Sequence, residues 1–125
     1  MSVAVALDRL REEVDRYGAS PFLLTVTDDA RPHAVSVTVA WDGDDLVAGA
    51  GRSTAANAAA RPTISLLWPP IEPAGYSLIV DGTAVVVDQQ VRVRPDKAVL
   101  HRSAPSPDPL SSCTSDCQTV LPRRT

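Results

Sequence analysis

The chain has 125 residues, of which 44% are hydrophobic and 22% are charged, and its formal net charge is −3 at pH 7. This length allows one domain, and the lack of a dense run of lysine or arginine excludes broad nucleic-acid binding through phosphate neutralisation. No apolar segment is long enough to span a membrane, and the first ten residues lack the basic leader of a signal peptide. We therefore expect a cytoplasmic protein with neither a nucleic acid nor a membrane as partner.

Residues 3–17 are predicted to form an amphipathic helix. Its polar face carries oppositely charged residues four positions apart, which is not the basic bias of a membrane-surface helix. Gly18 and Pro21 end the helix. Apolar residues at alternating steps of four and three give one stripe, which we expect to pack on the body of the fold: Val3, Leu7, Leu10, Val14 and Tyr17.

The most regular strand is predicted in "RPHAVSVTVAWDGDD" (31–45), where larger residues alternate with small ones. The Asp42-Gly43 pair in this stretch is a hairpin signal. The larger residues of the alternation are Val35, Val37, Val39 and Trp41.

Five further strands and one short helix complete the predicted elements. The helix covers about 54–60, the strand at 76–88 is expected to bend at Asp81-Gly82, and the last strand is expected to be interrupted near Pro95. The pattern predicts a mainly β domain over residues 1–102, a small closed or nearly closed barrel, followed by an irregular tail over 103–125. The five strands lie at 21–29, 46–51, 63–68, 76–88 and 91–102.

The segment "GAGRSTAANAAARP" (49–62) has the features of an anion-binding site. A helix N-terminus offers unpaired amides and a partial positive charge. Arg52 adds a full charge, Ser53 or Thr54 can cap the helix, and Gly49 and Gly51 allow close approach of a ligand. Phosphate is the expected ligand; the alternative is an ordinary helix cap beside a solvated arginine.

The succession "FLLTVTDDARPHAVSVTVAWDGDDLVAGAGRSTAANAAARPTISLLW" resembles the flavin-binding split β-barrel family related to pyridoxamine 5'-phosphate oxidases. The order of features carries this resemblance over about residues 5–102: a strand with an acidic turn, "RPHAVSV", the "WDGDDL" hairpin, the glycine loop, a short helix with Asn57, and "RPTISLL". The resemblance implies a six-stranded split β-barrel with an N-terminal helix and one short inserted helix, assembled as a homodimer.

The resemblance also implies an FMN site between the two subunits. The phosphate would bind at the glycine loop and helix start, with Asn57 at the position of the family's helix asparagine. The strand around Ser36 would run along the isoalloxazine ring and offer backbone groups to its polar edge. The small residues of this strand leave room for a flat ring, although packing of the first helix or solvent exposure explains them equally. The implied cofactor-binding residues are Val35, Ser36, Val37, Gly51, Arg52, Ser53, Thr54 and Asn57.

The expected function is an FMN-dependent oxidoreductase that transfers a hydride to or from a small-molecule substrate or electron acceptor. The alternative is a non-catalytic protein that binds flavin, deazaflavin or haem, because no nucleophile–base triad or carboxylate pair stands out. Thr54 occupies the place where many members carry a lysine, which keeps a deazaflavin coenzyme or haem open as the cofactor. The chain lacks the longer C-terminal region that true pyridoxamine-phosphate oxidases use for substrate, so that activity is not assigned.

Four other side chains have two or more interpretations each. His33 is expected either to lie at the surface or to face the flavin ring. Trp68 is expected either to cover the flavin of the partner subunit or to fill the interface between the two subunits. Cys113 and Cys117 form a C-x3-C spacing, for which unpaired thiols, a disulfide and a weak zinc pattern are the alternatives. No metal site is predicted.

Overall fold

A computed structural model describes residues 1–104 of the chain. The predicted tail from residue 105 onward, with Cys113 and Cys117, lies outside the described residues. Within residues 1–104 there are eight strands, two α-helices and one 3₁₀ helix, in the order β1 (Ser2–Val5), η1 (Leu7–Arg9), α1 (Leu10–Tyr17), β2 (Phe22–Val26), β3 (Pro32–Ser36), β4 (Val39–Asp42), β5 (Asp45–Gly49), α2 (Arg52–Ala60), β6 (Thr63–Trp68), β7 (Ser77–Val87) and β8 (Gln90–His101).

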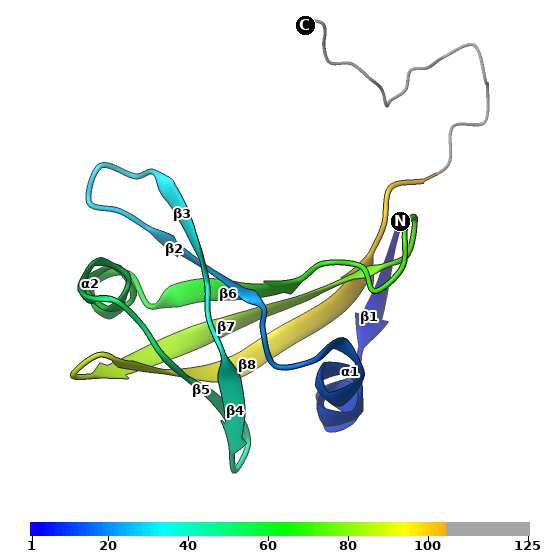
Figure 1. Ribbon diagram of the computed structural model, residues 1–125, viewed down its shortest axis with the longest axis horizontal. Coiled ribbons are helices and arrows are strands. Elements are labelled where there is room, and N and C mark those ends of the chain that lie inside the picture. Colours follow the sequence, from blue (N-terminus) through cyan, green and yellow to red (C-terminus); the bar gives the residue numbers. More distant parts are fainter. Residues whose placement is uncertain (105–125) are drawn as a thin grey trace, which may run out of the picture.

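The strands form one curved antiparallel sheet in the order β3-β2-β6-β7-β8-β5-β4 (Figure 1). The long strands β7 and β8 run through its centre, and β1 pairs with the end of β8, where Ser2 lies opposite His101. The mainly β class and the barrel-like curvature are therefore confirmed, although the described residues form eight strands instead of six. No helix within residues 1–104 is long and apolar enough to cross a membrane.

The first additional strand corrects the predicted N-terminal helix. Residues 2–5 form β1 because the edge of β8 offers them backbone hydrogen bonds, which outweigh the helical spacing of Val3. The helix α1 begins only at Leu10, after the 3₁₀ turn η1. Leu10 and Val14 are buried as predicted, whereas Leu7 remains 50% exposed.

The second additional strand arises because the strand predicted in the stretch 31–45 divides into β3 and β4. Between them the amide of Val37 donates to the carbonyl of Pro21 (3.0 Å), and the amide of Val39 donates to that of Ala19 (2.8 Å). The chain then leaves β2 and pairs with β5 at the other end of the sheet. The predicted alternation persists across the division: odd-numbered residues from 35 to 41 are buried or half-buried, and even-numbered residues from 34 to 40 are exposed. One polypeptide segment thus joins the two ends of the split barrel.

The core consists mainly of aliphatic side chains from the sheet, together with Leu10 and Val14 of α1 and Ala58 of α2. Trp68 also lies in this core, and its indole N–H donates to the carbonyl of Gly18 (2.7 Å). Neither surface interpretation of Trp68 is therefore correct. The fully buried sheet residues include Leu23, Leu46, Leu66, Leu78, Val80 and Val91.

The predicted irregularity of the two long strands is confirmed. Their register shifts between Asp81 and Gly82, opposite Pro95. A side chain at Gly82 has no room, because a Cβ there would lie 2.7 Å from the carbonyl oxygen of Arg94. Proline supplies no ladder donor and glycine permits the close backbone approach, which explains why both occur at the bulge.

Candidate functional site

The helix α2 begins at Arg52, two residues earlier than predicted, with Gly51 as its N-cap. Glycine has no side chain with which to cap, and Ser53 and Thr54 lie inside the first turn, so the expected capping role of these two residues is wrong. The first helical hydrogen bond runs from the amide of Ala55 to the carbonyl of Gly51 (2.9 Å). The amides of residues 52–54 therefore precede the helical ladder and give this end of α2 its partial positive charge.

The outer side of the first turn of α2 is exposed to solvent, and the positive charge of Arg52 there has no acidic partner in the turn. Arg52 and Ser53 are exposed, and within residues 1–104 Arg52 makes no ion pair and no side-chain hydrogen bond. The first turn carries no acidic residue. A Cβ placed on Gly49 or Gly51 would meet nothing within 4 Å. The loop is nevertheless held in place, because the amide of Ala50 donates to the carbonyl of Gln89 (2.8 Å).

The inner side of α2 positions the helix on the sheet. Asn57 is 8% exposed, and its Nδ2 donates to the buried hydroxyl of Thr25 on β2 (3.2 Å). Thr54 is 3% exposed, and its Oγ1 lies 3.4 Å from Nε2 of His33 on β3. Both side chains thus face the sheet, and His33 is half-buried against the helix. The predicted phosphate contacts of this segment accordingly depend on Arg52, Ser53 and the free amides.

The strand β3 lies at one end of the strand order and has an open edge. Hydrogen bonding alternates along an antiparallel strand, and Val37 directs its amide to Pro21 while Val35 lies opposite Leu23 on β2. The backbone groups of Ser36 therefore point to the open edge. Of the three residues predicted to contact a ring, Val35 and Ser36 lie on β3 and Val37 follows it. Ser36 has free backbone groups, and its exposed side chain lies beside the half-exposed Phe22.

The contact of His33 with Thr54 brings the two predicted parts of the site together. It places the beginning of β3 against the first turn of α2. Ser36 lies three residues further along β3, which corresponds to about 10 Å of extended strand. The phosphate and ring regions are thus neighbouring parts of one structure.

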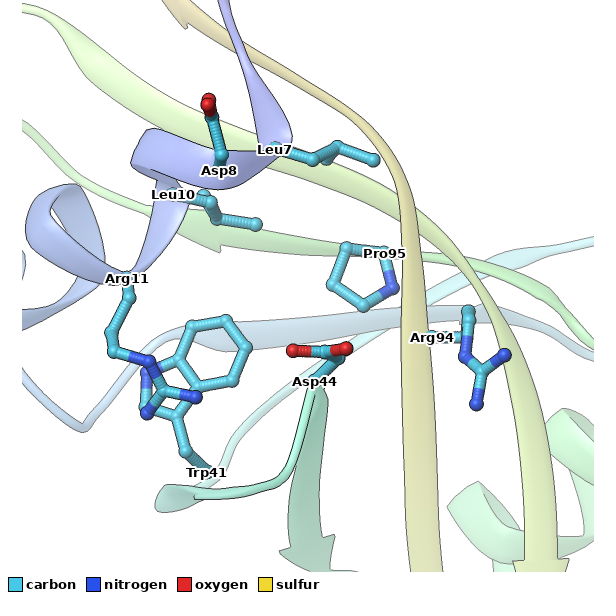
Figure 2. Close-up of a pocket in the computed structure, with 8 residues that line it drawn as sticks. All are labelled: Leu7, Asp8, Leu10, Arg11, Trp41, Asp44, Arg94 and Pro95. Carbon is cyan, nitrogen blue, oxygen red and sulfur yellow. The ribbon is translucent and has the colours of Figure 1, made fainter.

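A separate cavity of about 460 Å³ lies away from α2, between η1, α1, the β4–β5 turn and β8 (Figure 2). Trp41 forms one of its walls. The guanidinium of Arg11 stacks on this indole at 4.5 Å from the ring centroid and donates to the carbonyl of Gly43 (2.7 Å). The sequence showed Trp41 as part of a strand, but nothing in its spacing indicated this cavity.

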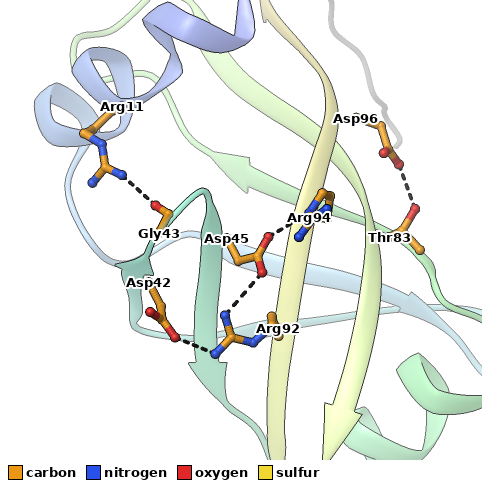
Figure 3. Close-up of polar contacts among 8 residues, drawn as sticks. All are labelled: Arg11, Asp42, Gly43, Asp45, Thr83, Arg92, Arg94 and Asp96. Atoms are coloured by element: carbon orange, nitrogen blue, oxygen red, sulfur yellow. Dashed lines mark hydrogen bonds and ion pairs between the residues drawn. The ribbon is translucent and has the colours of Figure 1, made fainter.

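An ionic cluster ties β4, β5 and β8 together beside this cavity (Figure 3). Arg92 donates to Asp42 (2.5 Å) and Asp45 (3.2 Å), and Arg94 donates to Asp45 (2.9 Å). The hydrogen bond from Arg94, followed by that from Arg92, lowers the pKa of Asp45. This cluster is not among the features predicted from the sequence, although two arginines at alternate positions and two aspartates flanking the hairpin turn are visible signals.

No protein-family model matches the chain. Solved structures with the same fold include a putative pyridoxamine 5'-phosphate oxidase from Listeria innocua (TM-score 0.62, 17% identity, 78% of this chain and 98% of that one). They also include the FAD binding protein from Mycobacterium smegmatis (0.58, 16%, 82% and 100%) and a protein named F420 Reductase (0.52, 20%, 64% and 88%). The fold is therefore the split β-barrel of pyridoxamine 5'-phosphate oxidase-like proteins.

Two mycobacterial proteins are similar to the chain in sequence. The uncharacterized proteins Mb0449c of Mycobacterium bovis and MT0457 of Mycobacterium tuberculosis are each 38% identical to it over 132 aligned positions. The alignment covers 90% of this chain and 92% of either relative. The chain belongs to the same family as these two proteins.

Proposed function

We propose that this protein binds FMN between two copies of the chain and acts as an oxidoreductase on a small-molecule substrate or electron acceptor. The observation that carries the proposal is the exposed N-terminal turn of α2, where Arg52 and three free amides have no acidic neighbour in the turn. Such a turn favours a phosphate group. The names of the similar FAD binding protein and F420 Reductase support a flavin-type cofactor.

The residues of the site have separate tasks in this proposal. Arg52 presents a planar guanidinium that suits bidentate contact with phosphate, and Ser53 adds a hydroxyl beside the amides. Ser36 offers its backbone N–H and C=O, at the open edge of β3, to the polar edge of the ring. The bound flavin itself would supply the hydride chemistry, while the protein positions it and shields it from water.

A second copy of the chain is part of the proposal because the surface around Gly49 and Gly51 is open in a single chain. Planar cofactors are usually held in sites that bury most of their surface. A partner subunit placed over β3 and the half-exposed Phe22 would supply the missing cover. Native mass spectrometry of the isolated protein would report both the subunit number and the mass of any bound cofactor.

Titrations with FMN and with riboflavin test the phosphate site directly. Loss of a hydrogen bond to a charged group costs about 1.5–3 kcal/mol, so Arg52→Ala should weaken FMN binding by about ten- to a hundredfold. Riboflavin has no phosphate, and its weaker binding should be unchanged in this variant. Arg9→Ala, at the exposed end of η1, is the matched control and should bind FMN like the parent protein.

The proposal fails if neither flavin changes its visible spectrum or fluorescence in the presence of the protein. If both flavins bind equally well and Arg52→Ala has no effect, the N-terminal turn of α2 is not a phosphate site and the phosphate makes no favourable contact with the protein.

The alternative function is a non-catalytic carrier of flavin, deazaflavin or haem. It is favoured by one observation: neither β3 nor α2 carries an acidic side chain that could serve as a general acid or base. Turnover of the cofactor-loaded protein with a nicotinamide donor and an electron acceptor would contradict the carrier role. The visible spectrum of the protein as isolated distinguishes flavin from haem.

A further inference from the structure

The cavity beside Trp41 has the composition of a binding site for a small amphipathic molecule. Its volume of about 460 Å³ lies in the range of small-molecule pockets. Residues of η1 and α1 line it, and Figure 1 shows α1 at the other side of the molecule from α2. The proposed cofactor residues do not line it, so an inference about this cavity does not depend on the proposed function.

Apolar groups from four elements surround the cavity. Leu7 of η1 and Leu10 of α1 lie on one side, Pro95 of β8 lies on a second, and the indole of Trp41 on β4 lies on a third (Figure 2). Leu7 is 50% exposed, although its neighbour Leu10 is buried. A ligand with an aromatic or branched apolar body would cover Leu7 and contact all four groups.

Two exposed carboxylates line the cavity, and Asp44 is the one beside Trp41, because the carboxylate of Asp8 points away from the indole (Figure 2). Figure 2 shows the carboxylate of Asp44 between the indole of Trp41 and the ring of Pro95. Within residues 1–104, Asp44 makes neither a side-chain hydrogen bond nor an ion pair. A carboxylate beside an aromatic face is a suitable environment for an ammonium group.

The positive charges near the cavity are already engaged. Arg94 also lines the cavity but is paired with Asp45, and Arg11 is held by the carbonyl of Gly43 and the face of Trp41 (Figures 2 and 3). Both guanidinium groups thus have direct partners other than Asp44, although the charge of Asp44 also acts on Arg94 and contributes to the raised pKa of that group. We propose that the cavity binds a small monocationic amine with an aromatic or branched apolar body, with Asp44 as the partner of its ammonium group.

The test compares 2-phenylethylamine with its neutral isostere 2-phenylethanol. Each is titrated into the isotopically labelled full chain, and binding is followed through the indole N–H signal of Trp41 and the backbone amides. The amine should bind at least about tenfold more tightly than the alcohol. The saturating shifts should map to Leu7–Arg11, the β4–β5 turn and Pro95's neighbours.

Two variants and one control make the result specific. Asp44→Asn keeps the size of the side chain, and it should weaken amine binding at least about tenfold while leaving the alcohol unchanged. Leu7→Ala, at a half-exposed position, should weaken both ligands by a similar factor because it removes a shared apolar wall. Asp88→Asn, on the exposed β7–β8 turn with φ near 57°, should change neither.

Three results would overturn the proposal. The first is equal affinity for amine and alcohol in the parent protein. The second is unchanged amine binding in Asp44→Asn when its amide spectrum shows the parent fold. The third is a set of shifts confined to α2 and β3, which would place the amine at the other site.

Discussion

The side chains of α2 divide between two roles at neighbouring positions. Arg52 and Ser53 face outward with free amides beside them, whereas Thr54 and Asn57 face the sheet and contact His33 and Thr25. A substitution on the inner side should therefore affect folding, and one on the outer side should affect ligand binding. The family resemblance alone, which assigns both sides to the cofactor, does not separate these effects.

Asn57→Ala should lower the free energy of unfolding by about 1–3 kcal/mol without any ligand present, because the buried hydroxyl of Thr25 loses its donor. Ser53→Ala, at an exposed position of the same helix, should stay within about 0.5 kcal/mol of the parent. Urea unfolding of the ligand-free proteins measures both values. Unchanged stability of Asn57→Ala together with lost flavin binding would show that this asparagine contacts the cofactor directly.

At the scale of the elements, the bulge between β7 and β8 requires glycine at position 82, where there is no room for a side chain. Gly82→Ala should destabilise the protein by about 1–3 kcal/mol, because its Cβ would press on the backbone of Arg94 at 2.7 Å. Gly49→Ala is the matched control, since a Cβ there meets nothing within 4 Å. Thermal and urea unfolding of both variants checks this difference. Equal stability of the two variants would mean that β8 shifts to accommodate the added methyl group.

The sequence predicts elements well where local pattern and tertiary contacts agree. The alternation of Val35, Val37 and Val39, the Asp42-Gly43 hairpin and the strand at 63–68 are all present in the structure. It fails at residues 2–5, because pairing with β8 joins segments almost a hundred residues apart and has no local signal. The division between β3 and β4 could not be predicted either, because the alternation of inward-facing and outward-facing residues continues unchanged across it.

The candidate site was predictable in type but not in orientation. Glycine, arginine and hydroxyl residues at a helix start indicate an anion site from their chemistry alone. Whether Thr54 or Ser53 faces outward depends on where α2 begins, and helix boundaries shift by one or two residues with tertiary context. The cavity beside Trp41 was not predictable, because it is enclosed by η1, α1, β4 and β8 from separate parts of the chain.

At the scale of the whole molecule, the cluster around Asp45 joins an edge strand to the centre of the sheet. Arg92 on β8 reaches across β5 to Asp42 on β4, while both Arg92 and Arg94 donate to Asp45. The pKa of Asp45 is lowered in the folded protein, so the unfolded chain takes up its proton first as the pH falls. The cluster therefore stabilises the fold at neutral pH and loses this effect below the ordinary pKa of about 3.8.

Asp45→Asn should be less stable than the parent at pH 7, and its stability should fall less between pH 7 and pH 3 because the titrating carboxyl is absent. Urea midpoints measured across this pH range test the expectation. Asp88→Asn, which removes an exposed carboxylate outside the cluster, should follow the parent curve more closely. A parallel acid response of the parent and Asp45→Asn would exclude a contribution of the cluster to acid unfolding.

The division of residues 32–42 into two short edge strands, β3 and β4, also reduces the tendency of the protein to aggregate. Open strand edges can recruit strands from other molecules, and among the described residues such edges lie at β1, β3 and β4. These three strands have only four, five and four residues, and the chain changes its pairing partner between β3 and β4. None of these edges is long enough to template an extended intermolecular sheet. The molecule can thus leave the backbone of Ser36 accessible to a ligand without exposing a surface on which fibrils would grow.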